Sequence, residues 1–138
     1  MESFTYSDLK VGMTASFKKE ITHKDILDFS GITGDKNPLH LDEAYSKETS
    51  YKRPVVFGLL VNSLLSTLAG MHLPGKYSLI VYVESYFRNP CFEGDVLDVF
   101  GEIENKIDST NVIIIKTKIT NQGSDLIMNG RLFVKVLK

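Results

Sequence analysis

The segment "LLVNSLLSTLAGM", residues 59–71, determines most of the architecture predicted for this 138-residue chain. It is apolar on most sides of a helix and lacks the alternation of a strand. A helix that is hydrophobic nearly all round is usually buried. Gly58 precedes the segment, and either Gly70 or Pro74 with Gly75 ends it, so we expect a buried helix here. The stretch is too short and too often interrupted by polar residues to be a membrane span.

Strands are predicted on both sides of this helix. "MTASFKKE" at 13–20 is a short strand before it, and after Tyr77 apolar residues alternate with polar ones. Turn sequences at 93–95, 108–110 and 121–124 divide this part into four segments of about ten residues, which favours an antiparallel meander. One strand before the helix and four after it predict an α+β domain, in which an antiparallel β-sheet wraps around a central buried α-helix.

Two further helices are predicted between the first strand and the buried helix. Thr22 stands three residues before Asp25, as in a capping box, and an apolar stripe at helical spacing follows until two glycines end it. A short helix is expected at 42–48, with Asp42 as its cap. The polar loop between these helices is therefore short and constrained.

Length and composition indicate one globular domain that spans residues 1–138. A formal net charge of -1 gives no electrostatic reason to expect nucleic acid or an anionic membrane as partner. The single cysteine, Cys91, cannot form an internal disulfide, and the polar N-terminus does not resemble a signal peptide. We therefore expect a soluble cytoplasmic protein. A sheet that covers a helix with one face leaves an edge exposed, which favours a homodimer or higher homo-oligomer.

The loop "GDKNPLHLD", residues 34–42, holds the first candidate site. Pro38 restricts the backbone, so Asp35 and His40 project from a constrained loop. A carboxylate and an imidazole at this spacing could converge on one water molecule and move a proton near neutral pH. Asn37 can hold the loop by bonding to its own backbone, although Asp, Asn and Gly also make a plain turn for the same reason. No Cys or His spacing suggests a metal site.

The start of the buried helix is the second candidate site. Glycine at 58 permits close approach, and a helix N-terminus presents unpaired N–H groups that suit a developing oxyanion or enolate. Gly58, Asn62 and Ser66 form a polar stripe on one side of the helix. Burying Asn62 and Ser66 without partners would cost about 1–3 kcal/mol each, so the stripe either bonds to neighbouring backbone or lines a polar pocket. Ser66 could also bond to a carbonyl one turn earlier.

With these residues identified, the segment from Phe29 to Ser66 resembles the hydratase motif of the MaoC-like, (R)-specific enoyl-CoA hydratase family. The resemblance rests on the pattern D-x-N-P-x-H, followed by R-P-x-x-x-G, and extends to Gly75. It implies a hot-dog fold and a hydro-lyase of fatty acid metabolism. Such an enzyme reversibly hydrates trans-2-enoyl thioesters to (R)-3-hydroxyacyl thioesters. It needs no metal or redox cofactor, and coenzyme A or the phosphopantetheine of acyl carrier protein carries the substrate.

The same resemblance assigns roles to residues. Asp35 and His40 match the catalytic pair that holds the water, and the N–H of Gly58 matches the donor to the thioester carbonyl. Ser66 matches the supporting serine of the family, and Asn37 stabilises the loop, while Asn62 is a further supporting residue on the helix. One position departs from the pattern, because Phe57 stands where the family commonly has histidine. Phe57 changes acyl selectivity if it only shapes the pocket, and lowers activity if the position orients water or the loop.

Three other functions remain open at this stage. A 3-hydroxyacyl-[acyl-carrier-protein] dehydratase would need a basic patch for its acidic carrier, and Lys47, Lys52 and Arg53 are candidates. A non-catalytic acyl-thioester-binding module would have no need of both Asp35 and His40. A thioesterase on the same fold would release a free thiol.

Overall fold

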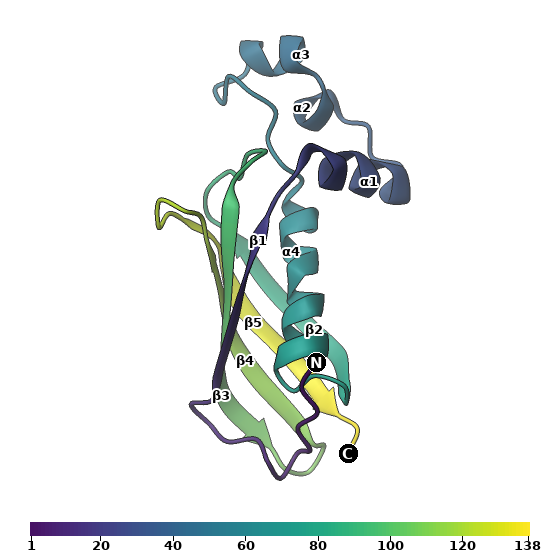
Figure 1. The fold of residues 1–138 in the computed structure, drawn as a ribbon, viewed down its shortest axis with the longest axis vertical. Coiled ribbons are helices and arrows are strands. Elements are labelled where there is room, and N and C mark those ends of the chain that lie inside the picture. The colour runs from purple at the N-terminus through teal and green to yellow at the C-terminus, as the bar shows by residue number, and fades with distance from the viewer.

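The computed structural model of the protein describes residues 1–138, in which five strands form one antiparallel sheet that curves around a single long helix (Figure 1). The sheet has the order β1-β3-β4-β5-β2, with β1 (Thr14–Glu20), β2 (Ser78–Phe87), β3 (Val96–Ile107), β4 (Val112–Thr120) and β5 (Leu126–Val136). The helices are α1 (His23–Thr33), α2 (Pro38–Leu41), α3 (Glu43–Glu48) and α4 (Gly58–Thr67), the last continued by a π-helical turn, η1 (Leu68–His72). This confirms the predicted α+β fold.

Local side-chain chemistry starts the short helices as the sequence indicates. The Thr22 side chain accepts a hydrogen bond from the Asp25 N–H, and the Asp25 carboxylate accepts one from the Thr22 N–H, so the capping box is confirmed. Asp42 caps α3 by accepting from the Tyr45 N–H at 3.0 Å. The sequence did not predict α2, which begins at Pro38. These helices gather at one end of α4, where they overhang the sheet (Figure 1).

The predicted four-strand meander is wrong in one respect. Strands β3, β4 and β5 are consecutive neighbours, but β2 pairs with β5 at the far edge and does not touch β3. The link at 88–95 is not a tight hairpin. It crosses the end of the sheet, where the Cys91 carbonyl accepts a hydrogen bond from the Val56 N–H at 2.8 Å. The turn between Phe92 and Asp95 comes only after this crossing, just before β3.

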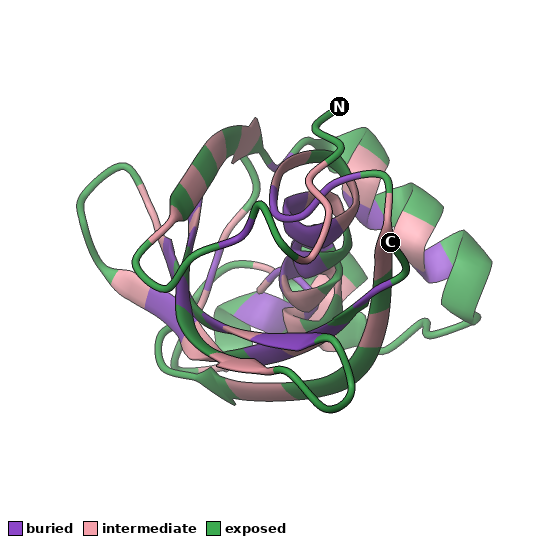
Figure 2. Ribbon diagram, turned by 90° about the horizontal axis from the view of Figure 1, so that it is seen from below, coloured by how far each residue is buried: buried purple, intermediate pink, exposed green.

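The central helix is buried on one side only, which corrects the prediction of a fully buried helix. Leu65 and Leu68 are buried against the sheet, and a Cβ added at Gly101 of β3 would lie 2.8 Å from the Leu68 side chain. On the opposite side Leu59 is 64% exposed, and Ser66 is exposed as well. Viewed along the helix, buried turns of α4 lie inside the curve of the sheet (Figure 2). The sheet curves around α4 without enclosing it. None of the helices is both long enough and apolar enough to cross a membrane.

Replacing Thr117 with valine is expected to stabilise the protein by about 1 kcal/mol, or roughly 4 °C in Tm. Thr117 lies on the inner face of β4, is 1% exposed, and its hydroxyl has no hydrogen-bond partner. Valine keeps the shape and the strand preference while it removes the unpaired hydroxyl. Thermal and urea unfolding would measure the change. The alanine variant, which also loses a packed methyl group, should be less stable than the valine variant, and a valine variant below wild type would contradict the prediction.

Candidate active site

The loop before α2 is held by its own side chains. The Ser30 hydroxyl donates to the Asp35 carbonyl at 2.7 Å, and the Asn37 N–H donates to Oδ1 of Asp35 at 3.0 Å. The Asn37 side chain in turn accepts from the Leu39 N–H at 3.0 Å and caps α2. The prediction that Asn37 bonds to nearby backbone is therefore confirmed. Pro38 occupies the first position of α2, where its missing N–H costs nothing.

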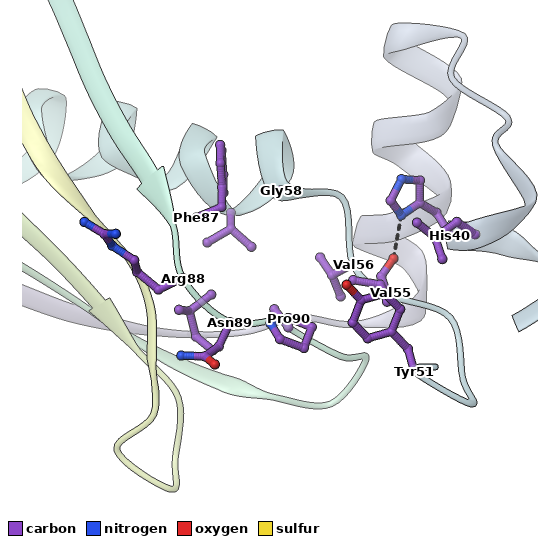
Figure 3. A pocket seen from close by; sticks show the side chains of 13 residues that line it. His40, Tyr51, Val55, Val56, Gly58, Phe87, Arg88, Asn89 and Pro90 are labelled. Atoms are coloured by element: carbon purple, nitrogen blue, oxygen red, sulfur yellow. Dashed lines mark hydrogen bonds between the residues drawn. The ribbon is translucent and has the colours of Figure 1, made fainter. Parts of the chain in front are cut away.

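His40 is fixed in both position and tautomer. Its Nδ1 lies 2.6 Å from the carbonyl oxygen of Val55, fifteen residues further along the chain (Figure 3). Because a carbonyl oxygen only accepts, Nδ1 carries the hydrogen, and in the neutral ring Nε2 keeps its lone pair for another partner. The ring also packs on Phe57, with 4.1 Å between the ring centroids. Phe57 is buried, so it forms a wall behind the imidazole.

A pocket of about 280 Å³ joins His40 to the start of α4 (Figure 3). Its lining comes from the α2–α4 region, from the end of β2 with the segment after it, and from β5: Leu39, His40, Tyr51, Val55, Val56, Gly58, Val61, Phe87, Arg88, Asn89, Pro90, Cys91 and Ile127. Most of these side chains are apolar. The pocket is therefore suited to an acyl chain that presents few polar atoms.

Gly58 supplies a polar backbone group to this pocket. It is the first residue of α4, and its N–H donates no hydrogen bond within the chain. A Cβ on this residue would come within 3.0 Å of the Phe87 ring, so the close packing of β2 against the helix start favours glycine. The unpaired N–H and the helix dipole together make a site for a partial negative charge.

The structure brings together some of the predicted site residues and separates others. His40 and Gly58 line the same pocket, whereas Asp35 is exposed on the loop and is not part of the lining. Asn62 and Ser66 are also outside it. The hydroxyl of Ser85 on β2 donates to the Asn62 side chain at 2.6 Å.

The predicted polar stripe on the helix is therefore corrected. Asn62 bonds to a side chain of the neighbouring strand, not to backbone and not to a ligand pocket. Ser66 is exposed and makes no hydrogen bond, because the sheet leaves that side of α4 uncovered. The backward hydrogen bond expected for Ser66 is made instead by Ser63, whose hydroxyl donates to the Leu60 carbonyl at 2.6 Å.

Sequence reasoning missed the residues that close the pocket from the other side. Phe87 ends β2, and Pro90 lies in the crossing segment that follows it. Tyr51 belongs to the turn after α3. None of them stands in a chemical motif. The one signal in the sequence is the group of aromatic residues and proline within 86–92.

The other two histidines and Arg53 do not line this pocket and make contacts elsewhere in the fold. His23 at the start of α1 is exposed and lies 3.1 Å from Glu93. His72 stacks on Phe17, with 5.2 Å between the ring centroids. No cluster of three or more His, Cys, Asp or Glu side chains is arranged to hold a metal ion. The guanidinium of Arg53 lies 3.7 Å above the Phe92 ring.

Cys91 should be almost inert toward thiol reagents in the folded protein. It is 3% exposed, and burial, with Asp95 nearby, raises the pKa of its thiol to about 12. A thiol with this pKa forms almost no thiolate at pH 8, and the thiolate is the reactive form. We expect reaction with a disulfide reagent at pH 8 to be at least roughly a hundredfold slower than in denaturant. Equal rates in the two conditions would contradict the burial of this residue.

The class of protein follows from the fold and the site together. A curved antiparallel sheet around one helix is the hot-dog fold, and its pocket pairs an imidazole with a helix-terminal N–H. Such an arrangement can stabilise a developing oxyanion and move a proton beside it. The chain matches the family model described as "MaoC like domain" over residues 8–123, and it belongs to that family.

Individual relatives agree with this assignment. The chain is 34% identical over 128 residues to an (R)-specific enoyl-CoA hydratase of Aeromonas caviae, which covers 93% of this chain and 96% of the relative. It is 32% identical to a 3-hydroxybutyryl-CoA dehydratase of Methylorubrum extorquens, over 96% of this chain and 84% of the relative. The solved structure of the (R)-hydratase from A. caviae superposes with a TM-score of 0.89 over 93% of this chain and 97% of that one. The predicted family and fold are confirmed.

Proposed function

We propose that this protein is a hydro-lyase that reversibly adds water to trans-2-enoyl thioesters and gives (R)-3-hydroxyacyl thioesters. The observation that carries the proposal is one apolar pocket that holds both the free Nε2 of His40 and the unpaired N–H of Gly58. The similarity to an (R)-specific enoyl-CoA hydratase, 34% over nearly the whole of both chains, supports the same reaction.

Gly58 binds the thioester carbonyl in this mechanism. As water attacks C3, the π electrons of the C2=C3 bond move toward the carbonyl oxygen, which becomes an enolate oxygen. Gly58 lines the pocket at the positive end of α4, and its N–H stabilises this charge more in the transition state than in the ground state. The apolar lining keeps bulk water away and strengthens this hydrogen bond.

Asp35 and His40 transfer the proton from the water to the substrate. The bond from Nδ1 of His40 to Val55 leaves Nε2 as an acceptor for the attacking water. Asp35 acts as base toward this water from the loop, where one carboxylate oxygen is held by the Asn37 N–H. As the water oxygen bonds to C3, the water gives its proton to Asp35. The proton passes from Asp35 to Nε2 of His40 and from Nε2 to C2 on the same face, so both side chains return to their starting protonation states. One water supplies both the hydroxyl and the hydrogen, so no net proton is consumed.

No metal or redox cofactor enters this mechanism, because the thioester itself acidifies the α-hydrogen. Coenzyme A or the phosphopantetheine of acyl carrier protein is the carrier of the acyl group. Asn37 supports the site through the cap of α2, and Asn62 supports it through its hydrogen bond to Ser85 on β2. The supporting role proposed for Ser66 rests on its match to the supporting serine of the family, since the residue is exposed and lies outside the pocket. The buried thiol of Cys91 also fits this chemistry, because a thiolate beside an enoyl group would add to it.

A homodimer is the assembly that we propose. The exposed face of α4 and the unpaired edge of β2 carry apolar side chains that a second copy would cover, among them Leu59, Leu79, Val83 and Phe87. A cytoplasmic location is proposed from the single free cysteine, which suits a reducing compartment.

A hydration assay tests the reaction directly. Purified protein with crotonyl-CoA should remove the enoyl absorbance and form the (R)-3-hydroxybutyryl thioester, identified by chiral analysis. Comparison of rates on crotonyl-CoA and on the crotonyl thioester of acyl carrier protein identifies the carrier, for which Lys47, Lys52 and Arg53 are the candidate basic residues. Binding without loss of absorbance would replace this proposal with a binding module, and release of free thiol would replace it with a thioesterase.

A further inference from the structure

The polar side chains that line the active-site pocket differ in whether they are free to bind a ligand. Arg88 donates through Nε to the Asn129 side chain at 2.8 Å, on strand β5. Asn89 donates through its amide to the Leu126 carbonyl at 2.7 Å. In Figure 3 the Arg88 side chain extends away from His40 and Gly58. Both side chains therefore have partners in the chain and hold the segment after β2 in place.

Two other polar side chains of the lining each keep a polar atom that has no partner in the chain. One is His40, whose Nε2 is free. The other is Tyr51, whose hydroxyl makes no hydrogen bond within the chain although the residue lines the same pocket. A phenol hydroxyl in a binding pocket usually finds a partner, because it is both a donor and an acceptor. The partner of Tyr51 is therefore expected to come from the ligand.

A hydrogen-bonded turn holds the backbone of Tyr51 in place. The Thr49 hydroxyl donates to the carbonyl of Ser46, a fully buried residue, at 2.7 Å, and it accepts from the Tyr51 N–H at 3.3 Å. Lys52 follows in the left-handed region, with φ of 64°, and its N–H donates to the Thr49 carbonyl at 3.3 Å. This turn directs the phenol into the pocket, so little entropy is lost when a ligand binds to it.

The position of Tyr51 in the pocket indicates which part of the substrate it contacts. Tyr51 is 46% exposed, whereas Gly58 and His40, the residues proposed to act on the reacting carbons, are half-buried, so Tyr51 lies nearer the mouth of the pocket. In Figure 3 the Tyr51 ring extends from the turn after α3 toward the other residues that line the pocket. The part of an acyl thioester that passes a mouth of this kind is the pantetheine arm. Its secondary amides offer the carbonyl acceptor that a phenol donor matches, and its methylene groups suit the apolar walls.

We propose that Tyr51 binds the pantetheine arm of the substrate, through a hydrogen bond from its hydroxyl to an amide carbonyl, and is a specificity-determining residue for pantetheine thioesters. This inference rests on the proposed hydratase function. Pantetheine is common to coenzyme A and to the prosthetic group of acyl carrier protein. Tyr51 therefore recognises both carriers equally and does not distinguish between them.

The test compares Tyr51→Phe with wild type on three crotonyl thioesters, those of coenzyme A, pantetheine and acyl carrier protein. Loss of one hydrogen bond should raise KM about fivefold on all three and leave kcat unchanged. The inhibition constant of butyryl-CoA, which cannot react, should rise by the same factor and reports binding directly. Tyr45→Phe is the matched control, since Tyr45 on α3 is 49% exposed and outside the pocket, and its variant should match wild type.

Each other result overturns the inference. An unchanged KM and inhibition constant would show that the hydroxyl touches no ligand. A fall in kcat at constant KM would place it at the reacting atoms, and an effect on coenzyme A alone would place it at the nucleotide. The proposed function is judged separately, by hydration in the wild type. If the wild type binds butyryl-pantetheine without hydrating crotonyl thioesters, weaker binding by Tyr51→Phe still supports the inference.

Discussion

Replacing His40 with glutamine is expected to lower kcat for crotonyl-CoA hydration at least roughly a hundredfold, while the fold stays intact. Glutamine can still donate to the Val55 carbonyl that now holds Nδ1. It cannot relay a proton, because its amide does not titrate near neutral pH. Steady-state kinetics with the purified variant, together with its Tm, would measure the effect. Because the group acts on the reacting atoms, kcat and kcat/KM should fall together.

Asp35→Asn should give a loss of similar size. The asparagine oxygen can still accept from the Asn37 N–H, so the loop keeps its shape while the charge and the base are lost. Asp42→Asn is the matched control. It neutralises a carboxylate of the same loop, and asparagine caps a helix as well as aspartate does, so kcat should stay near wild type.

Ordinary turnover in both His40→Gln and Asp35→Asn would remove the hydratase assignment. Loss in His40→Gln alone would assign the proton transfer to the imidazole and remove Asp35, the exposed member of the pair, from the mechanism. His72→Gln is a second control, because its ring stacks on Phe17 away from the pocket and should leave turnover unchanged.

Features that depend on a few neighbouring residues could be predicted from the sequence. The capping box of Thr22 and Asp25, the cap at Asp42 and the bond from Asn37 to backbone are all formed within three residues. Such bonds do not depend on the rest of the fold, so residue type and spacing are enough to predict them. The candidate pair at 35 and 40 was found in the same way, from one loop.

Features that depend on distant partners could not be predicted in this way. Strand β2 alternates like the other strands, and its sequence does not say whether it pairs with β3 or with β5. Its true place at the far edge brings Phe87 beside Gly58 and Ser85 beside Asn62. The pocket therefore depends on the crossing connection that the meander prediction left out. The anchor of His40 at Val55 likewise joins residues that no local pattern connects.

The exposed side of α4 is another feature that could not be predicted from the sequence. The composition of residues 59–71 is equally suited to a helix buried on all sides and to one whose outer face meets a second subunit. The curvature of the sheet decides between the two, because one sheet covers only one face of a helix. Ser66 and Leu59 lie on the uncovered face, which no count of apolar residues would distinguish from the covered one.

The Gly58→Pro variant is expected to have a kcat about 100-fold or more below that of the Gly58→Ala variant. Proline removes the N–H proposed to hold the thioester oxygen, and it is favoured at the first position of a helix. Phe57 has φ of -54° and ψ of 123°, a conformation suited to the residue before a proline. The helix should therefore start normally in the variant, and the change acts on the hydrogen-bond donor.

Gly58→Ala is needed as the reference because both variants add a Cβ that approaches the Phe87 ring at 3.0 Å. The alanine variant keeps the N–H, so any cost of moving this ring is common to the two. The two variants are compared in kcat for crotonyl-CoA, with Tm and circular dichroism to show that both fold. Equal kcat in the two would mean that the amide at the start of α4 stabilises no developing charge. A deficit confined to the proline variant, in kcat and not in the inhibition constant of butyryl-CoA, identifies the N–H as a group that acts in the transition state.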